Sequence, residues 1–200
     1  MNKIVAIAVS TGGPKALQHV IPKLPVDLDA PVILVQHMLT GFTKDLAKRL
    51  NQLSRIEVKE AMEYEPIRKG CVYIAQGGLH LNYKANLDLG TFYYSDQPNR
   101  QGVKPCSDYL FESLVDSHFD EVVCVVMTGM GCDATEGIIH LEKKKKIFVI
   151  AQSSETCTVY GMPRSIIEAK KADKIVPLDQ IAQEIILRVG VRKDGRKPVS

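Results

Sequence analysis

The sequence contains no tryptophan, and only 6% of its 200 residues are aromatic. Platforms that stack single-stranded nucleic acid depend on aromatic side chains, so this composition argues against such a protein. No apolar run approaches the roughly 18 residues that a membrane-spanning helix needs. The short apolar stretch at residues 4–9 lacks the length and the cleavage site of a signal peptide. We therefore expect no nucleic-acid partner and no membrane insertion.

Cysteine is also scarce and poorly placed for cross-linking. The five cysteines include no Cys-x-x-Cys pair, so neither a disulfide framework nor a zinc site is indicated. We expect no metal or organic cofactor, and a reducing cytoplasm fits this cysteine usage. The net charge is only +3, and residues 191–200 supply four basic and one acidic side chain. The rest of the chain is formally neutral, which excludes a broad basic surface for nucleic acid.

Four short apolar runs, at residues 4–9, 31–36, 122–127 and 147–151, resemble strands buried on both faces of a parallel sheet. Segments with helical spacing of apolar residues lie between them, as in residues 42–53 and 181–189. Pro14 suits the first turn of a helix, and Ser107 and Asp179 are candidate N-caps. This alternation predicts a doubly wound α/β sheet.

The middle of the chain has a different pattern. Residues 71–75, 80–83 and 87–94 are predicted as short strands, and the last two are predicted to form an antiparallel hairpin through residues 84–86. Residues 192–200 show no periodicity, which indicates a disordered tail. We therefore expect one domain at residues 1–191 and a tail at 192–200.

Polar residues follow three of the apolar runs. Ser10 follows the first and His37 the second, while Asp133 lies shortly after the third. Ligand sites in open parallel sheets form beyond the carboxyl ends of the strands, so the three side chains are expected at one edge. A serine nucleophile needs a base, and an imidazole needs a carboxylate that fixes its tautomer. The sequence predicts a catalytic triad of Ser10, His37 and Asp133.

Two glycine-containing turns at the same edge are candidate oxyanion holes. Backbone N–H groups at Thr11 and Gly12, or at Met130 and Gly131, could face a developing negative charge. The turn after Ser10 also leads into a predicted helix, whose N-terminus favours negative charge.

Other interpretations of these residues remain open from the sequence. Ser10 could be only an N-cap, and residues 12–15 could bind a phosphate, although they lack the full spacing of a nucleotide-binding loop. His80 could replace His37 as base, but its place in the hairpin predicts a pocket rim or a solvent-facing position. Glu155 could replace Asp133. Cys132 could be a nucleophile, although inert packing near a core strand is the simpler expectation.

Three motifs resemble the catalytic domain of the CheB family of chemotaxis receptor methylesterases: Ser-Thr-Gly-Gly at residues 10–13, Gln-His-Met at 36–38 and Thr-Gly-Met-Gly-Cys-Asp at 128–133. Further matches, which extend the resemblance from Ile4 to about Val191, are Tyr73-Ile74-Ala75, Gly78, His80, Pro105, Asp108, Leu110-Phe111, Cys157 and Gly161-Met162-Pro163-Arg164.

The resemblance implies a three-layer α/β fold with a mostly parallel sheet and a small hairpin. It also implies a Ser-His-Asp triad at Ser10, His37 and Asp133, with the backbone N–H of Met130 in the oxyanion hole. The implied activity is hydrolysis of glutamate γ-methyl esters on the cytoplasmic helices of chemoreceptors, together with deamidation of selected glutamines. The implied chemistry needs no metal or cofactor.

The sequence departs from the family pattern at several positions. Ala8 and Ala134 stand where glycine is common, and Leu79 stands where arginine is often found. The common His-Arg-Pro-Ser motif reads Val-Lys-Pro-Cys at residues 103–106. These last two departures concern substrate contacts. Family members usually carry an N-terminal receiver domain, and we expect none in this chain.

Two other function classes stay open. A receptor-binding module with a decayed triad would bind without turnover. A nucleotide-binding α/β protein would need an acidic residue about 20 positions after the glycine turn. Asp27 and Asp29 lie too close to Ser10 and in a predicted loop, so this second class is disfavoured.

Overall fold

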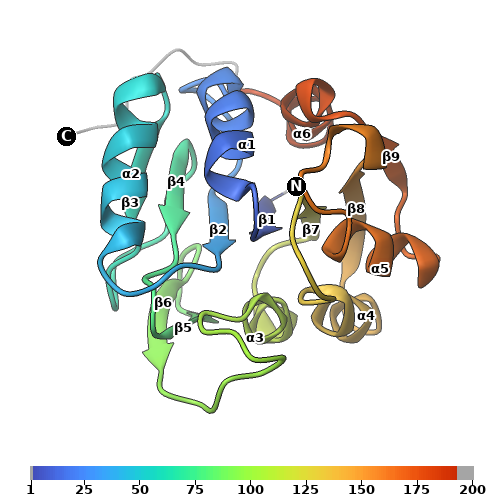
Figure 1. The fold of residues 1–200 in the computed structure, drawn as a ribbon. Coiled ribbons are helices and arrows are strands. Elements are labelled where there is room, and N and C mark those ends of the chain that lie inside the picture. The colour runs from blue at the N-terminus through green and yellow to red at the C-terminus, as the bar shows by residue number, and fades with distance from the viewer. Residues whose placement is uncertain (1, 193–200) are drawn as a thin grey trace.

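The computed structural model describes residues 2–192, and its centre is a seven-stranded parallel sheet (Figure 1). The strand order is β3-β4-β2-β1-β7-β8-β9, and every neighbouring pair runs parallel. The strands are β1 (Lys3–Val9), β2 (Val32–Gln36), β3 (Glu57–Glu60), β4 (Cys71–Ile74), β7 (Glu121–Val126), β8 (Lys146–Gln152) and β9 (Lys174–Val176). The predicted doubly wound α/β fold is confirmed.

Helices cover both faces of the sheet, so the molecule has three layers. The helices are α1 (Gly13–Val20), α2 (Phe42–Leu53), α3 (Ser107–Ser113), α4 (Thr135–Glu142), α5 (Met162–Glu168) and α6 (Ile181–Val189). Apolar residues of α1, α2 and α6 pack on one face, and those of α3, α4 and α5 pack on the other. Alternate residues of β1 enter the two clusters, which explains why its sequence is apolar from Ile4 to Val9.

The predicted hairpin is present as β5 (His80–Lys84) and β6 (Thr91–Ser95), a separate antiparallel pair. Its connection is longer than the three residues expected, and it spans residues 85–90. The Asn86 side chain accepts hydrogen bonds from the backbone N–H groups of Asp88 and Gly90, which replaces ladder pairing with a side-chain-stabilised turn. The remaining predicted strand of this region, at residues 71–75, is present as β4 and belongs to the main sheet.

Two of the features predicted for the helices are present in the structure, and the two predicted N-caps are wrong. Helix α2 has the predicted bounds 42–53, and Pro14 lies in the first turn of α1. Ser107 is not the N-cap of α3, because that position is Cys106 and the Ser107 backbone N–H is bonded to the Asp133 carboxylate. Asp179 is not the N-cap of α6 either: it lies within the short 3₁₀ turn Leu178–Gln180, and the N-cap is the next residue, Gln180. Three other 3₁₀ turns of the same length are Ile21–Lys23, Leu114–Asp116 and Ser154–Thr156.

The register of the central strands brings the predicted site residues to one edge. Val9 of β1 pairs with Gln36 of β2, and the His37 backbone N–H bonds the Val9 carbonyl at 3.2 Å. Ser10 and His37 therefore leave neighbouring strands at the same level. Within residues 2–192, no helix is both long and apolar enough to span a membrane.

The predicted tail lies almost entirely outside the described residues. Its first residue, Arg192, donates its backbone N–H to the Asp27 carbonyl at 2.8 Å, and residues 193–200 are not described.

Candidate active site

Ser10 occupies a tightly bonded turn between β1 and α1. Its backbone N–H donates to the Thr128 carbonyl at 2.9 Å, while its own carbonyl accepts from the Gly13 N–H at 2.8 Å and the Gln36 amide at 3.0 Å. A Cβ atom built on Gly129 would lie 2.8 Å from the Ser10 Cβ, so the absence of a side chain at Gly129 makes room for the serine. The half-buried Ser10 side chain thus lies against the loop after β7.

His37 and Asp133 are in direct contact. The distance from His37 Nε2 to Asp133 Oδ2 is 2.6 Å, and the two side chains are 10% and 3% exposed. An ionised carboxylate can only accept, so Nε2 carries the proton in this hydrogen bond. The other ring nitrogen, Nδ1, is then the basic one and is the atom that would receive a proton from a nucleophile.

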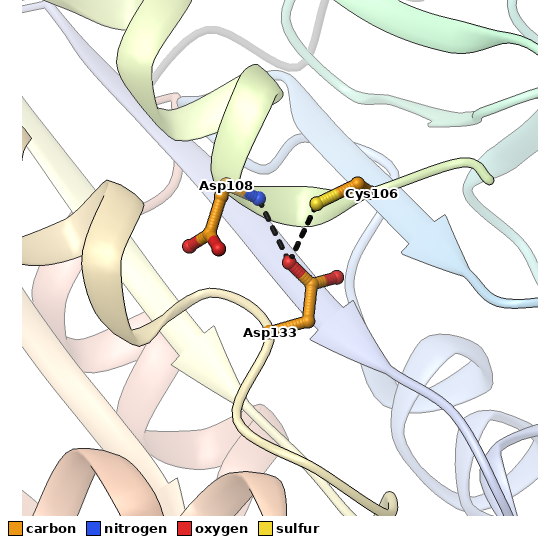
Figure 2. Close-up of side chains that lie close together, drawn as sticks. All are labelled: Cys106, Asp108 and Asp133. Atoms are coloured by element: carbon orange, nitrogen blue, oxygen red, sulfur yellow. Dashed lines mark hydrogen bonds between the residues drawn. The ribbon is translucent and has the colours of Figure 1, made fainter. Parts of the chain in front are cut away.

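Asp133 lies in a cradle of hydrogen-bond donors at the start of α3 (Figure 2). Its Oδ1 accepts from the Asp108 N–H at 3.0 Å, the Ala134 N–H at 2.9 Å and the Cys106 thiol at 3.1 Å. Its Oδ2 accepts from the Ser107 N–H at 2.7 Å as well as from His37. Burial alone would raise the pKa of Asp133, but His37 and the other donors outweigh it and lower this pKa to about 2.

Asp108 is a second buried carboxyl near the first; its backbone N–H is bonded to Asp133, while its own carboxyl points away from that bond (Figure 2). Burial and the neighbouring Asp133 charge raise the pKa of Asp108 to about 6. Its Oδ1 accepts from the Gly137 N–H at 2.7 Å and its Oδ2 accepts from the Gln101 amide at 2.7 Å. Asp108 therefore ties α4 and the loop before α3 to the segment that holds Asp133.

The structure does not place all three predicted triad members in mutual contact. Among the hydrogen bonds of residues 2–192, none joins the Ser10 hydroxyl to the His37 ring. Catalytic hydrogen bonds are often long in unliganded enzymes and shorten when substrate binds. The His37–Asp133 pair is thus observed, Ser10 lies at the adjacent strand end, and the complete triad stays a prediction.

The predicted oxyanion donors lie at the same edge. Thr11 and Met130 are exposed, with Met130 74% exposed. Their loops are joined by a hydrogen bond of 2.9 Å from the Thr128 hydroxyl to the Thr11 carbonyl. In the described part of the chain, neither Thr11 nor Met130 donates its backbone N–H to another residue. Both N–H groups are thus available to a ligand, and their catalytic role stays a prediction.

The competing base, His80, is fully buried, so the expectation of a pocket rim or a solvent-facing position is wrong. Its Nδ1 accepts the Cys106 backbone N–H at 3.1 Å, and its ring packs edge-on against Tyr109 at 4.7 Å. The hairpin folds back onto α3 and covers this histidine. Burial and the nearby Lys104 charge lower its pKa. His80 is therefore closed off from solvent and holds the Cys106 backbone of the cradle.

The other competitors do not fit their alternative roles. Glu155 is exposed and accepts from the Ser153 hydroxyl at 2.6 Å. Cys132 is exposed, so the expectation of inert core packing is wrong; the loop after β7 carries it outward to the Gln101 amide oxygen at 3.0 Å. Desolvation and nearby carboxylates raise the pKa of the Cys132 thiol, which keeps it protonated and poorly nucleophilic.

A cavity of about 420 Å³ opens beside His37. It is lined by His37, Met38, Leu39, Gly78, Asn99, Gly102, Val103 and Lys104. The departure from the family pattern at residues 103–106 already pointed to Val103 and Lys104 as substrate contacts. Sequence reasoning missed Asn99, because its distance along the chain from His37 conceals its proximity.

One group of side chains has the composition of a metal site. Ligand atoms of Cys106, Asp108 and Asp133 lie within 4.8 Å of one another. Their oxygens, however, already accept hydrogen bonds from backbone and side-chain donors, and burial raises the pKa of the Cys106 thiol. A metal ion would have to displace these donors and the thiol proton. The donor set is therefore that of a cradle for a carboxylate.

Comparison with known proteins agrees with this geometry. The crystal structure of the Thermotoga maritima CheB methylesterase catalytic domain superposes with a TM-score of 0.90 at 39% sequence identity, covering 94% of this chain and 100% of that one. The family model described as CheB methylesterase matches residues 5–185. The chain belongs to the CheB methylesterase family.

Full-length relatives of this CheB-family chain are longer than it is. A protein-glutamate methylesterase/protein-glutamine glutaminase of Bacillus subtilis is 47% identical over 92% of this chain and 52% of its own length. A relative of the same description from Syntrophomonas wolfei is 45% identical over 93% of this chain and 54% of its own length. The chain spans about half the length of these relatives.

Proposed function

We propose that this chain hydrolyses glutamate γ-methyl esters on polypeptide substrates by a Ser-His-Asp mechanism. The observation that carries the proposal is the His37–Asp133 hydrogen bond of 2.6 Å at the strand end next to Ser10. The names of the relatives support the substrate, since they are described as protein-glutamate methylesterases. Family membership supports methylated helices of chemoreceptors as the partner and the cytoplasm as the location.

In the first step, the Ser10 hydroxyl attacks the γ-carbonyl carbon and His37 Nδ1 accepts the hydroxyl proton. The imidazolium is stabilised by Asp133, whose low pKa keeps it ionised throughout. The carbonyl oxygen becomes an oxyanion, and the N–H groups of Thr11 and Met130 are the donors proposed to stabilise it. When the tetrahedral intermediate collapses, the C–O bond to methoxide breaks and His37 returns the proton to form methanol.

The second step releases the product. His37 takes a proton from water, the resulting hydroxide attacks the acyl-serine ester, and the bond to Ser10 Oγ breaks as the proton returns to it. The substrate keeps a free glutamate carboxylate. Glutamine deamidation follows the same path, with ammonia as the leaving group in place of methanol, and the glutaminase part of the relatives' names supports it.

The proposal is tested by methanol release from methylated chemoreceptor membranes. Ser10→Ala is expected to abolish release, because it removes the hydroxyl that is proposed to attack the γ-carbonyl carbon. Ser154→Ala, which changes an exposed serine in the turn Ser154–Thr156, is the matched control and should release methanol normally. Retained turnover in folded Ser10→Ala would overturn the nucleophile assignment. Wild-type protein that binds the membranes without releasing methanol would favour the binding-module alternative.

A further inference from the structure

The cavity beside His37 has an uneven charge distribution. Of its eight lining residues, Lys104 carries a permanent charge, His37 is titratable and the other six are neutral. The carboxylates near the site, Asp133 and Asp108, are buried behind it and already hold several hydrogen-bond donors each. The charged group in the cavity lining is therefore the ammonium of Lys104, which is paired with the Asp96 carboxylate.

The side chain of Lys104 is mostly covered by the protein, but its ion-pair partner is exposed to solvent. Its side chain is only 16% exposed, so its stem is covered, whereas its ion-pair partner Asp96 is 87% exposed. An ion pair with one partner in solvent is worth little and is easily exchanged for another. The Lys104 charge also contributes to the lowered pKa of the buried His80, so its field extends into the protein. An incoming carboxylate could replace Asp96 at little cost.

We propose that Lys104 binds a carboxylate of the substrate polypeptide next to the ester being cleaved, and so favours acidic substrate segments. This inference rests on the proposed function. Each turnover of the methylesterase or glutaminase reaction leaves a new carboxylate on the substrate. A segment with several modifiable sites therefore becomes more acidic as it is processed. A cation at the cavity mouth would bind a processed position while the neighbouring ester lies at Ser10.

The test uses two synthetic peptides that each carry one glutamate γ-methyl ester, flanked on both sides by glutamates in one peptide and by glutamines in the other. The measured quantity is the ratio of kcat/KM for the acidic peptide to that for the neutral peptide. We expect a ratio of about ten in wild type, in keeping with one partly desolvated ion pair at low salt. The ratio should fall to near one in Lys104→Gln and survive in Lys104→Arg.

Two further variants sharpen the result. Asp96→Asn removes the competing carboxylate and should raise the ratio above that of wild type. Lys143→Gln removes an exposed charge at the C-terminal end of α4 and is the control for net charge, so its ratio should equal that of wild type. A Lys104→Gln ratio equal to the wild-type ratio would overturn the proposal, as would an equal loss in Lys143→Gln.

A binding experiment separates this inference from the proposed function. The same flanking sequences are synthesised with glutamine methylamide, which resists hydrolysis, in place of the ester, and their Kd values are measured by fluorescence anisotropy. If Lys104→Gln removes the preference in Kd but no ester is hydrolysed, Lys104 binds the acidic segment and it is the proposed function that fails. If the esters are hydrolysed but neither Kd nor kcat/KM depends on Lys104, the inference fails and the proposed function stands.

Discussion

The two buried carboxyls of the cradle should have opposite effects on the pH dependence of stability. The folded-state pKa of Asp108 is raised from 3.8 to about 6, so the folded protein binds this proton more tightly than the unfolded chain does. Its ionisation destabilises the fold at pH 7, and stability is gained as the pH falls from about 7 to 4. The shift of about two pKa units corresponds to a gain of about 3 kcal/mol, of which about 1 kcal/mol is reached by pH 5.

Asp133 has the opposite effect on the pH dependence of stability. Its folded-state pKa is lowered from 3.8 to about 2, so it contributes stability above pH 4 that is lost as the pH falls toward 2. The corresponding loss is about 2 kcal/mol. Together the two groups predict a stability maximum near pH 4 for their combined contribution.

The assay is urea unfolding of wild type and Asp108→Asn, followed by circular dichroism at pH 7, 6, 5 and 4. The difference in unfolding free energy between the two proteins isolates Asp108 from all other titrating groups. Asparagine also changes the contacts to Gln101 and Gly137, which shifts this difference by a constant amount but does not titrate. The difference should move in favour of wild type as the pH falls. A difference that is independent of pH, or that moves the other way, would refute the reasoning.

Three further predictions concern the same cradle. Gly137→Ala should lower the unfolding free energy by about 2 kcal/mol or more, because its Cβ would lie 2.7 Å from backbone atoms of Asp108; an unchanged urea midpoint would contradict this. Cys106→Ala should lower kcat several-fold and raise the acidic pKa of the kcat/KM profile. The reason is that Asp133 loses a hydrogen-bond donor and pairs more strongly with protonated His37. Cys106→Ser keeps a donor at this position and should restore both quantities. A profile that does not shift in Cys106→Ala would show that the thiol only fills space. Ala134 has φ 85°, a backbone conformation that disfavours branched side chains, so Ala134→Val should lower the melting temperature. Ala134→Gly should change the unfolding free energy by less than about 1 kcal/mol, because relief of strain and loss of methyl burial nearly cancel. Equal melting temperatures for the two variants would contradict this prediction.

The regular elements of the core were predictable because their signals are local. The apolar runs of β1, β2, β7 and β8 reflect burial on both sides of a parallel sheet, and the helical period of residues 42–53 matches α2. The short outer strands β3 and β9 were missed. Each has three or four residues of mixed polarity, as in Glu57–Glu60, and is recognisable as a strand only through pairing with its neighbour.

The positions of His80 and Cys132 were predicted wrongly for two different reasons. His80 has the sequence context of an exposed hairpin, but packing of that hairpin on α3 buries it. Cys132 follows a core strand, but the left-handed turn at Gly131 and Ala134 carries it outward. For His80 the deciding contact is with a segment far away in the chain, whereas for Cys132 it is the backbone conformation of the turn itself.

The sequence by itself determined the fold class and the edge of the sheet at which Ser10, His37 and Asp133 gather, because strand periodicity and parallel topology depend on local patterns. Tertiary structure alone decided what surrounds them. The donors to Asp133, the contact between Gly137 and Asp108, and the approach of Lys104 to the cavity beside His37 all join segments that are distant in sequence. Hydrogen bonding and charge act through space, so these contacts exist only once packing has brought the segments together.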